Sequence, residues 1–87
     1  MVFMKFTLED TSFGADYFVG TSEETILTDT HNGESFGGER FASHEVVPIE
    51  EVQALGFVYF RDAVSAVEGG CPSYYIGALR PSEVSVS

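Results

Sequence analysis

The side chains that could act as nucleophiles or general bases are few and lie far apart in the sequence. The chain has one cysteine, Cys71, and two histidines, His31 and His44. Cys71 follows an expected helix, whose C-terminal end carries partial negative charge, so we expect a bystander thiol there. His44 and Glu45 could form an acid–base pair, but no oxyanion site or substrate pocket can be recognised beside them. The sequence therefore predicts no enzyme activity and no cofactor.

Carboxylates are the most unusual feature of the composition. The chain has fourteen Asp and Glu residues and only four Lys and Arg residues, which gives it a formal net charge of −10. Residues 9–51 hold eleven of the carboxylates and one basic residue, Arg40, which accounts for the whole net charge. Such a field repels nucleic acid and anionic membranes and attracts basic protein surfaces.

Three hypotheses account for this charge. It could serve solubility or adaptation to high salt. It could dock the protein on a basic partner. It could also bind a metal ion or small ligand through a cluster such as Asp29, His31 and Glu34. The cluster lacks the spacing of a calcium loop, so no metal site is predicted.

The elements that must position these side chains are organised around one expected helix, Val47–Gly70. Pro48 suits its first turn and Gly69–Gly70 suits its end. Gly56 either splits the helix in two or only destabilises it locally, and we expect one continuous helix. Apolar residues recur along it at steps of three and four, as one helical stripe requires: Val52, Leu55, Tyr59, Phe60, Ala63, Val64 and Val67.

Short strands are expected before and after this helix. Residues 2–9 alternate between apolar and polar side chains, as in a strand with one buried face. The further strands expected are Asp16–Val19, Thr25–Thr30, a return strand Glu34–Val47 with Phe36, Phe41 and Val46 in the core, and a closing strand Tyr74–Leu79. Asn32–Gly33 would form the hairpin turn between the third and fourth strands.

The expected fold class is α+β. A small antiparallel sheet of about four to five strands would carry one main helix on one face, in the order β-β-β-β-α-β, with the other face partly wet. Residues 1–87 form a single domain with a polar tail over 81–87. No run of about 18 apolar residues and no secretion signal are present, so a cytoplasmic protein without a membrane span is expected.

Aromatic side chains are more numerous than one sheet face can cover. We expect most of them in the core and some on the surface, where they would serve a partner or a homodimer through the aromatic helix. The residues concerned are Phe57, Tyr59, Phe60, Tyr74 and Tyr75.

The segment Phe36–Pro72 resembles bacterial immunity proteins of the Imm1 type, which neutralise toxins by binding them. The shared outline consists of a hairpin with Gly33 and Gly37-Gly38, a strand ending in Val46-Val47-Pro48, a helix beginning with Glu50-Glu51, and an exit through Gly70 and Pro72. Tyr74 or Tyr75 stands where the family's final strand usually has Trp. In bulk properties the chain is also similar to phage anti-CRISPR inhibitors, which are compact and acidic, and some of which imitate DNA phosphates.

The leading functional hypothesis is a small acidic inhibitor or antidote that blocks a basic, nucleic-acid-handling protein without itself binding nucleic acid. Its carboxylates would take positions normally filled by phosphates. The expected partner-binding residues are Glu23, Glu24, Asp29, Glu34 and Glu39. The alternative is a self-associating structural domain whose charge serves solubility or high-salt adaptation.

Overall fold

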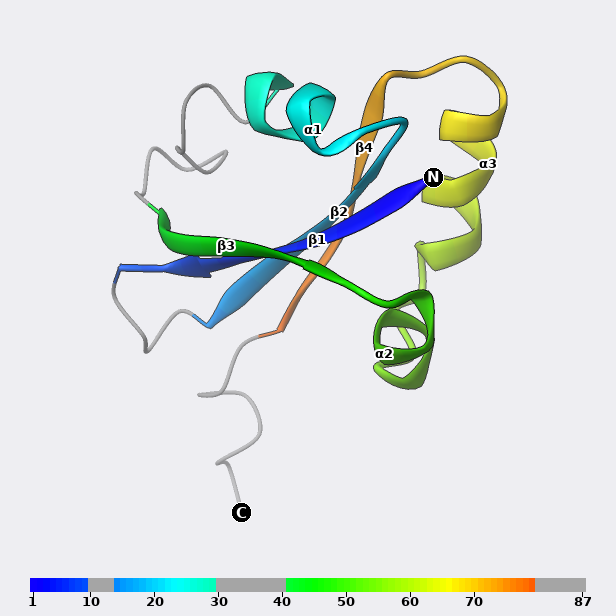
Figure 1. Ribbon diagram of the computed structural model, residues 1–87. Coiled ribbons are helices and arrows are strands. Elements are labelled where there is room, and N and C mark those ends of the chain that lie inside the picture. Colours follow the sequence, from blue (N-terminus) through cyan, green and yellow to red (C-terminus); the bar gives the residue numbers. More distant parts are fainter. Residues whose placement is uncertain (10–13, 30–40, 80–87) are drawn as a thin grey trace.

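A computed structural model describes residues 1–9, 14–29 and 41–79 of the chain. These residues form an α+β fold with a four-stranded antiparallel sheet in the spatial order β3-β1-β2-β4 (Figure 1). The elements in chain order are β1 (Val2–Leu8), β2 (Ala15–Gly20), α1 (Glu23–Asp29), β3 (Phe41–Val47), α2 (Ile49–Ala54), α3 (Phe60–Glu68) and β4 (Ser73–Leu79). The fold class is as predicted, whereas the element order and the single main helix are not.

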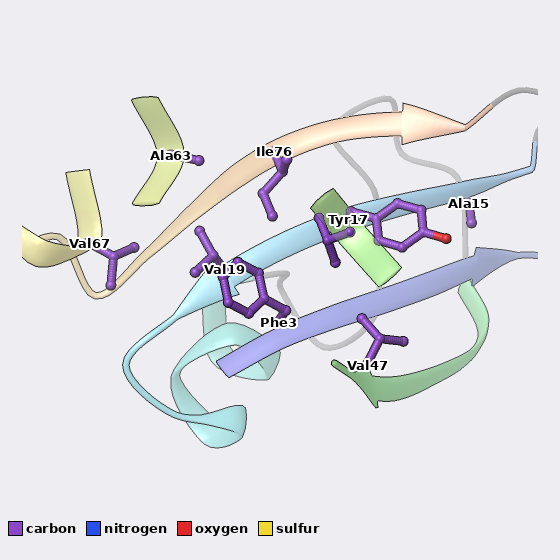
Figure 2. Packing of buried hydrophobic residues seen from close by; sticks show 9 residues of the cluster. Phe3, Ala15, Tyr17, Val19, Val47, Ala63, Val67 and Ile76 are labelled. Carbon is purple, nitrogen blue, oxygen red and sulfur yellow. The ribbon is translucent and has the colours of Figure 1, made fainter. Parts of the chain in front are cut away.

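Helices pack on both faces of the sheet, and this divides the core in two. The larger core lies beneath α2 and α3, and Figure 2 shows its side chains converging between the sheet and α3. It comprises Phe3, Ala15, Tyr17, Val19, Val47, Val52, Ala63, Val67 and Ile76. The smaller core lies beneath α1 and comprises Met4, Phe6, Phe18 and Ile26. Each helical layer therefore covers its own set of sheet residues.

Strand β1 confirms the predicted alternation, and the face expected to be partly wet carries the partly buried Lys5 and Thr7 together with the buried Phe3. Met4 and Phe6 are fully buried beneath α1. Phe3 points to the opposite face and is also buried, because its ring stacks on that of Phe60 with centroids 5.7 Å apart. The expectation of one helix on one face was wrong because residues 23–29 supply a second helical layer.

Helix α1 takes the place of residues 25–29 of the strand predicted over Thr25–Thr30, and Thr30 lies outside the described residues. The helix begins after Ser22, whose Oγ accepts a hydrogen bond from the Thr25 backbone N–H at 3.2 Å. The Ser22 and Thr25 hydroxyls also share a hydrogen bond of 2.8 Å. Glu23 and Glu24 place negative charge in the first turn, where the helix dipole favours it. This cap and the burial of Ile26 outweigh the β-propensity of the threonines.

The hairpin predicted at Asn32–Gly33 and the first part of its return strand lie outside the described residues. The described strand β3 begins at Phe41 and pairs with β1, not with residues 25–29. The predicted pairing of those two segments is therefore wrong, because the first of them is helical.

Two of the three core contacts predicted for this return strand are described. Phe41 packs as expected, with its ring 4.8 Å from that of Phe6, whereas Phe36 lies outside the described residues. Val46 is 52% exposed, and its neighbour Val47 is the buried residue. The prediction for Val46 was wrong because α2 and α3 cover the face that Val47 occupies.

The predicted helix over residues 47–70 is split at Gly56. Gly56 has a φ of 70°, a left-handed conformation that ends α2 and cannot continue an α-helix. The chain then turns so that the Phe57 ring lies 5.3 Å from that of Tyr17. Gly77 of β4 lies beneath Phe57, where an added Cβ would approach Cδ1 of the ring to 2.7 Å. The break thus inserts Phe57 between the helices and the sheet.

We expect Gly56→Ala to lower the free energy of unfolding by about 1 kcal/mol. The cost comes from the left-handed backbone alone, because a Cβ at this position meets no atom within 4 Å. Urea denaturation followed by circular dichroism measures it. Gly56→Asn is the control, since Asn tolerates this conformation better than Ala. A larger loss for Asn than for Ala would contradict the explanation.

Candidate functional site

The predicted partner-binding carboxylates that the structure describes lie along α1. Glu23 and Glu24 occupy its exposed first turn, and Asp29 is its exposed last residue. The other two predicted residues, Glu34 and Glu39, lie outside the described ranges. Within residues 1–9, 14–29 and 41–79, Glu23 and Glu24 form no ion pair. Both carboxylates are therefore open to a partner at the positive end of the helix.

A groove of about 810 Å³ separates one side of α1 from strand β3. Glu23, Glu24, Leu27 and Thr28 form one wall, because steps of one, four and five residues place them on the same side of the helix. The opposite wall is formed by residues 41–44 of β3. Leu27 and Phe41 give this α1–β3 groove apolar surface, and Glu23 and Glu24 give it two carboxylates.

A second hollow of about 700 Å³ lies at the outer edge of β4, and we call it the β4 hollow. Its carboxylates come from Asp29 of α1 and Asp62 of α3. Its aromatic side chains are Tyr59, which is 62% exposed, Tyr74, which is 45% exposed, and the partly buried Tyr75. The expectation that some aromatic residues are exposed is confirmed by Tyr59 and Tyr74.

The β4 hollow brings residues of β2 and α1 together with residues of α3 and β4, which lie more than 30 positions later in the sequence. The Ser73 hydroxyl donates a hydrogen bond to Oδ2 of Asp29, which ties the end of α1 to the start of β4. The alternation of β4 then turns Tyr74 to the α3 side of the sheet and Tyr75 to the α1 side, where its ring lies 5.3 Å from Phe18. The hollow thus follows the sheet edge from one face to the other.

The acidic half of the sequence does not form one acidic face. Glu23 and Glu24 lie on the α1 side, whereas Glu50 and Glu51 lie in the first turn of α2, on the opposite side of the sheet. Asp29 joins Asp62, which sequence analysis did not select, at the β4 hollow. Glu23 and Glu24 therefore border one recess and Asp29 and Asp62 another, while Glu50 and Glu51 border neither.

Tyr17, in the described part of the chain, has an ionisation that the fold clearly changes. Burial, followed by the negative charges of Glu51 and Glu45, raises the pKa of its phenol above the usual value of 10.0. The folded protein therefore holds the Tyr17 proton more tightly than the unfolded chain does. By linkage, the stability that protonated Tyr17 contributes is fully present below about pH 10 and is lost as the pH rises through the pKa of the folded state.

We expect Tyr17→Phe to remove much of the loss of stability between about pH 9 and about pH 11. Urea unfolding at the two pH values measures this loss. Tyr59→Phe is the matched control, because Tyr59 is exposed on the surface and should leave the pH dependence unchanged. Equal slopes in the wild type and Tyr17→Phe would contradict the assignment.

The groups considered for catalysis and metal binding are not gathered into a site in the described part of the chain. Cys71 is exposed and free, and His44 is exposed with its ring 5.6 Å from that of Phe6. Over the described ranges, no three His, Cys, Asp or Glu residues are grouped so as to hold a metal ion. His31 and Glu34 of the hypothetical metal cluster lie outside those ranges. No described helix has the length and apolar character needed to cross a membrane.

The fold and its two recesses define a small α+β domain with carboxylates beside open, partly apolar surfaces. No protein-family model, curated protein or solved structure matches this chain. The two recesses are therefore the features from which a function can be inferred.

Proposed function

We propose that this protein is a small acidic inhibitor that binds a basic, nucleic-acid-handling protein and blocks it. One observation supports this most directly: exposed carboxylates border two open recesses that also contain apolar surface. Such a combination suits a protein partner, because apolar contacts supply affinity and the charged rim supplies attraction and orientation.

The inhibitor would act by occupying a cationic surface and needs no chemical step. Glu23 and Glu24 are adjacent in the first turn of α1, and they would take the place of phosphates against Lys or Arg side chains of the partner. The apolar side chains Leu27 and Phe41 in the same groove would contact the partner beside these charges and help to exclude water from them. An immunity protein that neutralises a toxin and a phage inhibitor of a nucleic-acid-targeting defence system both fit this mode. Either would act in the cytoplasm, where such enzymes work.

The test is a titration of this protein against purified products of neighbouring genes that handle nucleic acid. We expect affinity for the partner to fall at least about tenfold between about 50 mM and about 500 mM NaCl. A DNA or RNA duplex should compete with the inhibitor. An affinity that does not change with salt concentration would contradict the proposal. So would a partner that binds nucleic acid and this protein at the same time.

Two double variants that remove the same amount of charge show which side of the protein contacts the partner. Replacing both Glu23 and Glu24 by Gln should weaken partner binding at low salt by about tenfold or more. The same replacement of Glu50 and Glu51, on the opposite side of the sheet, should have a much smaller effect. Equal effects of the two pairs would show that only overall charge matters.

A second candidate function, self-association, is favoured by exposed apolar residues around the helix break. Val58 is 87% exposed, Tyr59 62% and Leu55 37%. Two copies could cover these side chains against each other, although a charge of −10 on each opposes their approach. Light scattering over a range of protein concentrations tests this function, and a monomer throughout would exclude it.

A further inference from the structure

The β4 hollow combines two features that together select a cation. Exposed tyrosine rings offer electron-rich faces, to which a guanidinium or ammonium group is attracted. The carboxylates of Asp29 and Asp62 stand at the same hollow and add negative charge. An uncharged apolar ligand would use the rings and leave the negative charge of the carboxylates uncompensated.

One of these carboxylates is held in place before any ligand arrives. The Ser73 hydroxyl donates to Oδ2 of Asp29, so this side chain is oriented by a contact between two elements. Its second oxygen, Oδ1, remains as an acceptor for a ligand. Such preorganisation lowers the entropic cost of binding, because this side chain is already ordered.

The hollow also adjoins a sheet edge that is open in the described structure. Strand β4 pairs with β2 on one side, and within the described residues no strand pairs with its other side. An extended peptide can add to such an edge through its backbone, while one of its side chains enters a neighbouring recess.

We propose that the β4 hollow receives an arginine side chain from an extended segment of the basic partner. Arginine fits better than lysine, because its planar guanidinium stacks on an aromatic ring and also donates paired hydrogen bonds to a carboxylate. This inference rests on the proposed function and specifies the chemistry by which the partner is recognised.

A second copy of this chain is a poorer occupant. Each copy carries a net charge of −10, and the hollow itself carries two carboxylates. Association of two copies at this place would therefore concentrate like charges, whereas a basic segment neutralises them.

The test uses the full-length, ¹⁵N-labelled protein and two short peptides. The first is the acetylated and amidated peptide Thr-Val-Arg-Val-Thr, and the second contains citrulline, an uncharged isostere, in place of arginine. We expect the arginine peptide to produce saturable amide shifts at residues 59–62 and 73–76 in low salt. The citrulline peptide should bind at least about tenfold more weakly, because it cannot neutralise the carboxylates. Equal binding of the two peptides, or shifts confined to other elements, would overturn the inference.

Variants of the hollow provide an independent measurement. Asp29→Asn combined with Asp62→Asn should weaken binding of the arginine peptide about tenfold, and Tyr59→Leu should weaken it while keeping apolar area. Glu50→Gln combined with Glu51→Gln removes the same charge elsewhere and should leave the peptide affinity nearly unchanged. An equal loss of peptide affinity in that control would show that the peptide responds to overall charge and would overturn the inference of a specific site. Amide spectra of each variant show whether it is folded.

The outcome separates this inference from the proposed function. If the peptide binds the hollow but no nucleic-acid-handling protein is inhibited, the arginine site stands and the proposed function fails. If a partner is inhibited and its affinity is unchanged by the double Asp variant, the function stands and the arginine site is overturned.

Discussion

Phe6→Ala is expected to lower the free energy of unfolding by about 3–5 kcal/mol, the usual cost of truncating a fully buried aromatic residue. Phe6 has no exposed surface and lies at the centre of the core beneath α1. Its ring contacts those of Phe18, Phe41 and His44, at centroid distances of 5.3, 4.8 and 5.6 Å. Small domains have total free energies of unfolding of about 5–15 kcal/mol, so this variant would lose a large part of its stability.

Urea denaturation monitored by circular dichroism measures the effect of Phe6→Ala. Val46→Ala is the control, because Val46 is an apolar residue of the neighbouring strand and is 52% exposed. Its cost should remain below about 1 kcal/mol. Similar losses at the two positions would show that the core beneath α1 is not packed as described.

Gly20→Ala is expected to cost about 1–3 kcal/mol through overpacking. A Cβ at position 20 would come within 2.5 Å of Cγ1 of Ile26 and 3.1 Å of the Pro72 carbonyl oxygen. Ile26 is the fully buried residue by which α1 packs on the sheet, so the added methyl group would push the helix outward. Thermal and urea unfolding both measure this cost.

A double-mutant cycle tests that explanation. Ile26→Ala removes the side chain that the new methyl group would meet, at its own cost of about 2–5 kcal/mol. In the Ile26→Ala background, Gly20→Ala should therefore cost less than half of what it costs in the wild type. Additive losses would show that Gly20 and Ile26 do not compete for space.

The strands with the clearest sequence patterns were predicted well. Residues 2–9 and Tyr74–Leu79 correspond closely to β1 and β4, and Asp16–Val19 lies within β2. In each case apolar side chains pack against a helix that the pattern itself does not reveal. What could not be derived was the number of helical layers, because alternation indicates that one face is buried and leaves the other undetermined.

The two wrong element predictions each concern a segment in which the sequence holds a local signal and tertiary packing decides the outcome. Ser22 followed by Glu23 and Glu24 is a helix-start pattern, whereas the strand prediction depends only on the β-branched residues of TILTDT. Gly56 was recognised as a weak point of the helix, yet its φ of 70° depends on the tertiary contact that draws Phe57 onto Tyr17. Tertiary packing decided both cases.

The candidate site was predictable only in part. Glu23, Glu24 and Asp29 are exposed as expected, but they border two separate recesses and do not form one acidic face. Asp62 and Tyr74 come together at the β4 hollow only after α3 has packed beside β4. Their separation in the sequence shows no motif, so this hollow could be recognised only from the fold.

The strand order β3-β1-β2-β4 has a consequence for synthesis of the protein on the ribosome. The first two strands to emerge, β1 and β2, are those that finally lie in the middle of the sheet (Figure 1). All six residues of β2 are buried in the finished fold, yet their outer neighbour β4 is translated last among the described elements. Until β4 has been made, the outer edge of the apolar strand β2 therefore lacks its partner, and a ribosome-associated chaperone is expected to shield it during that interval.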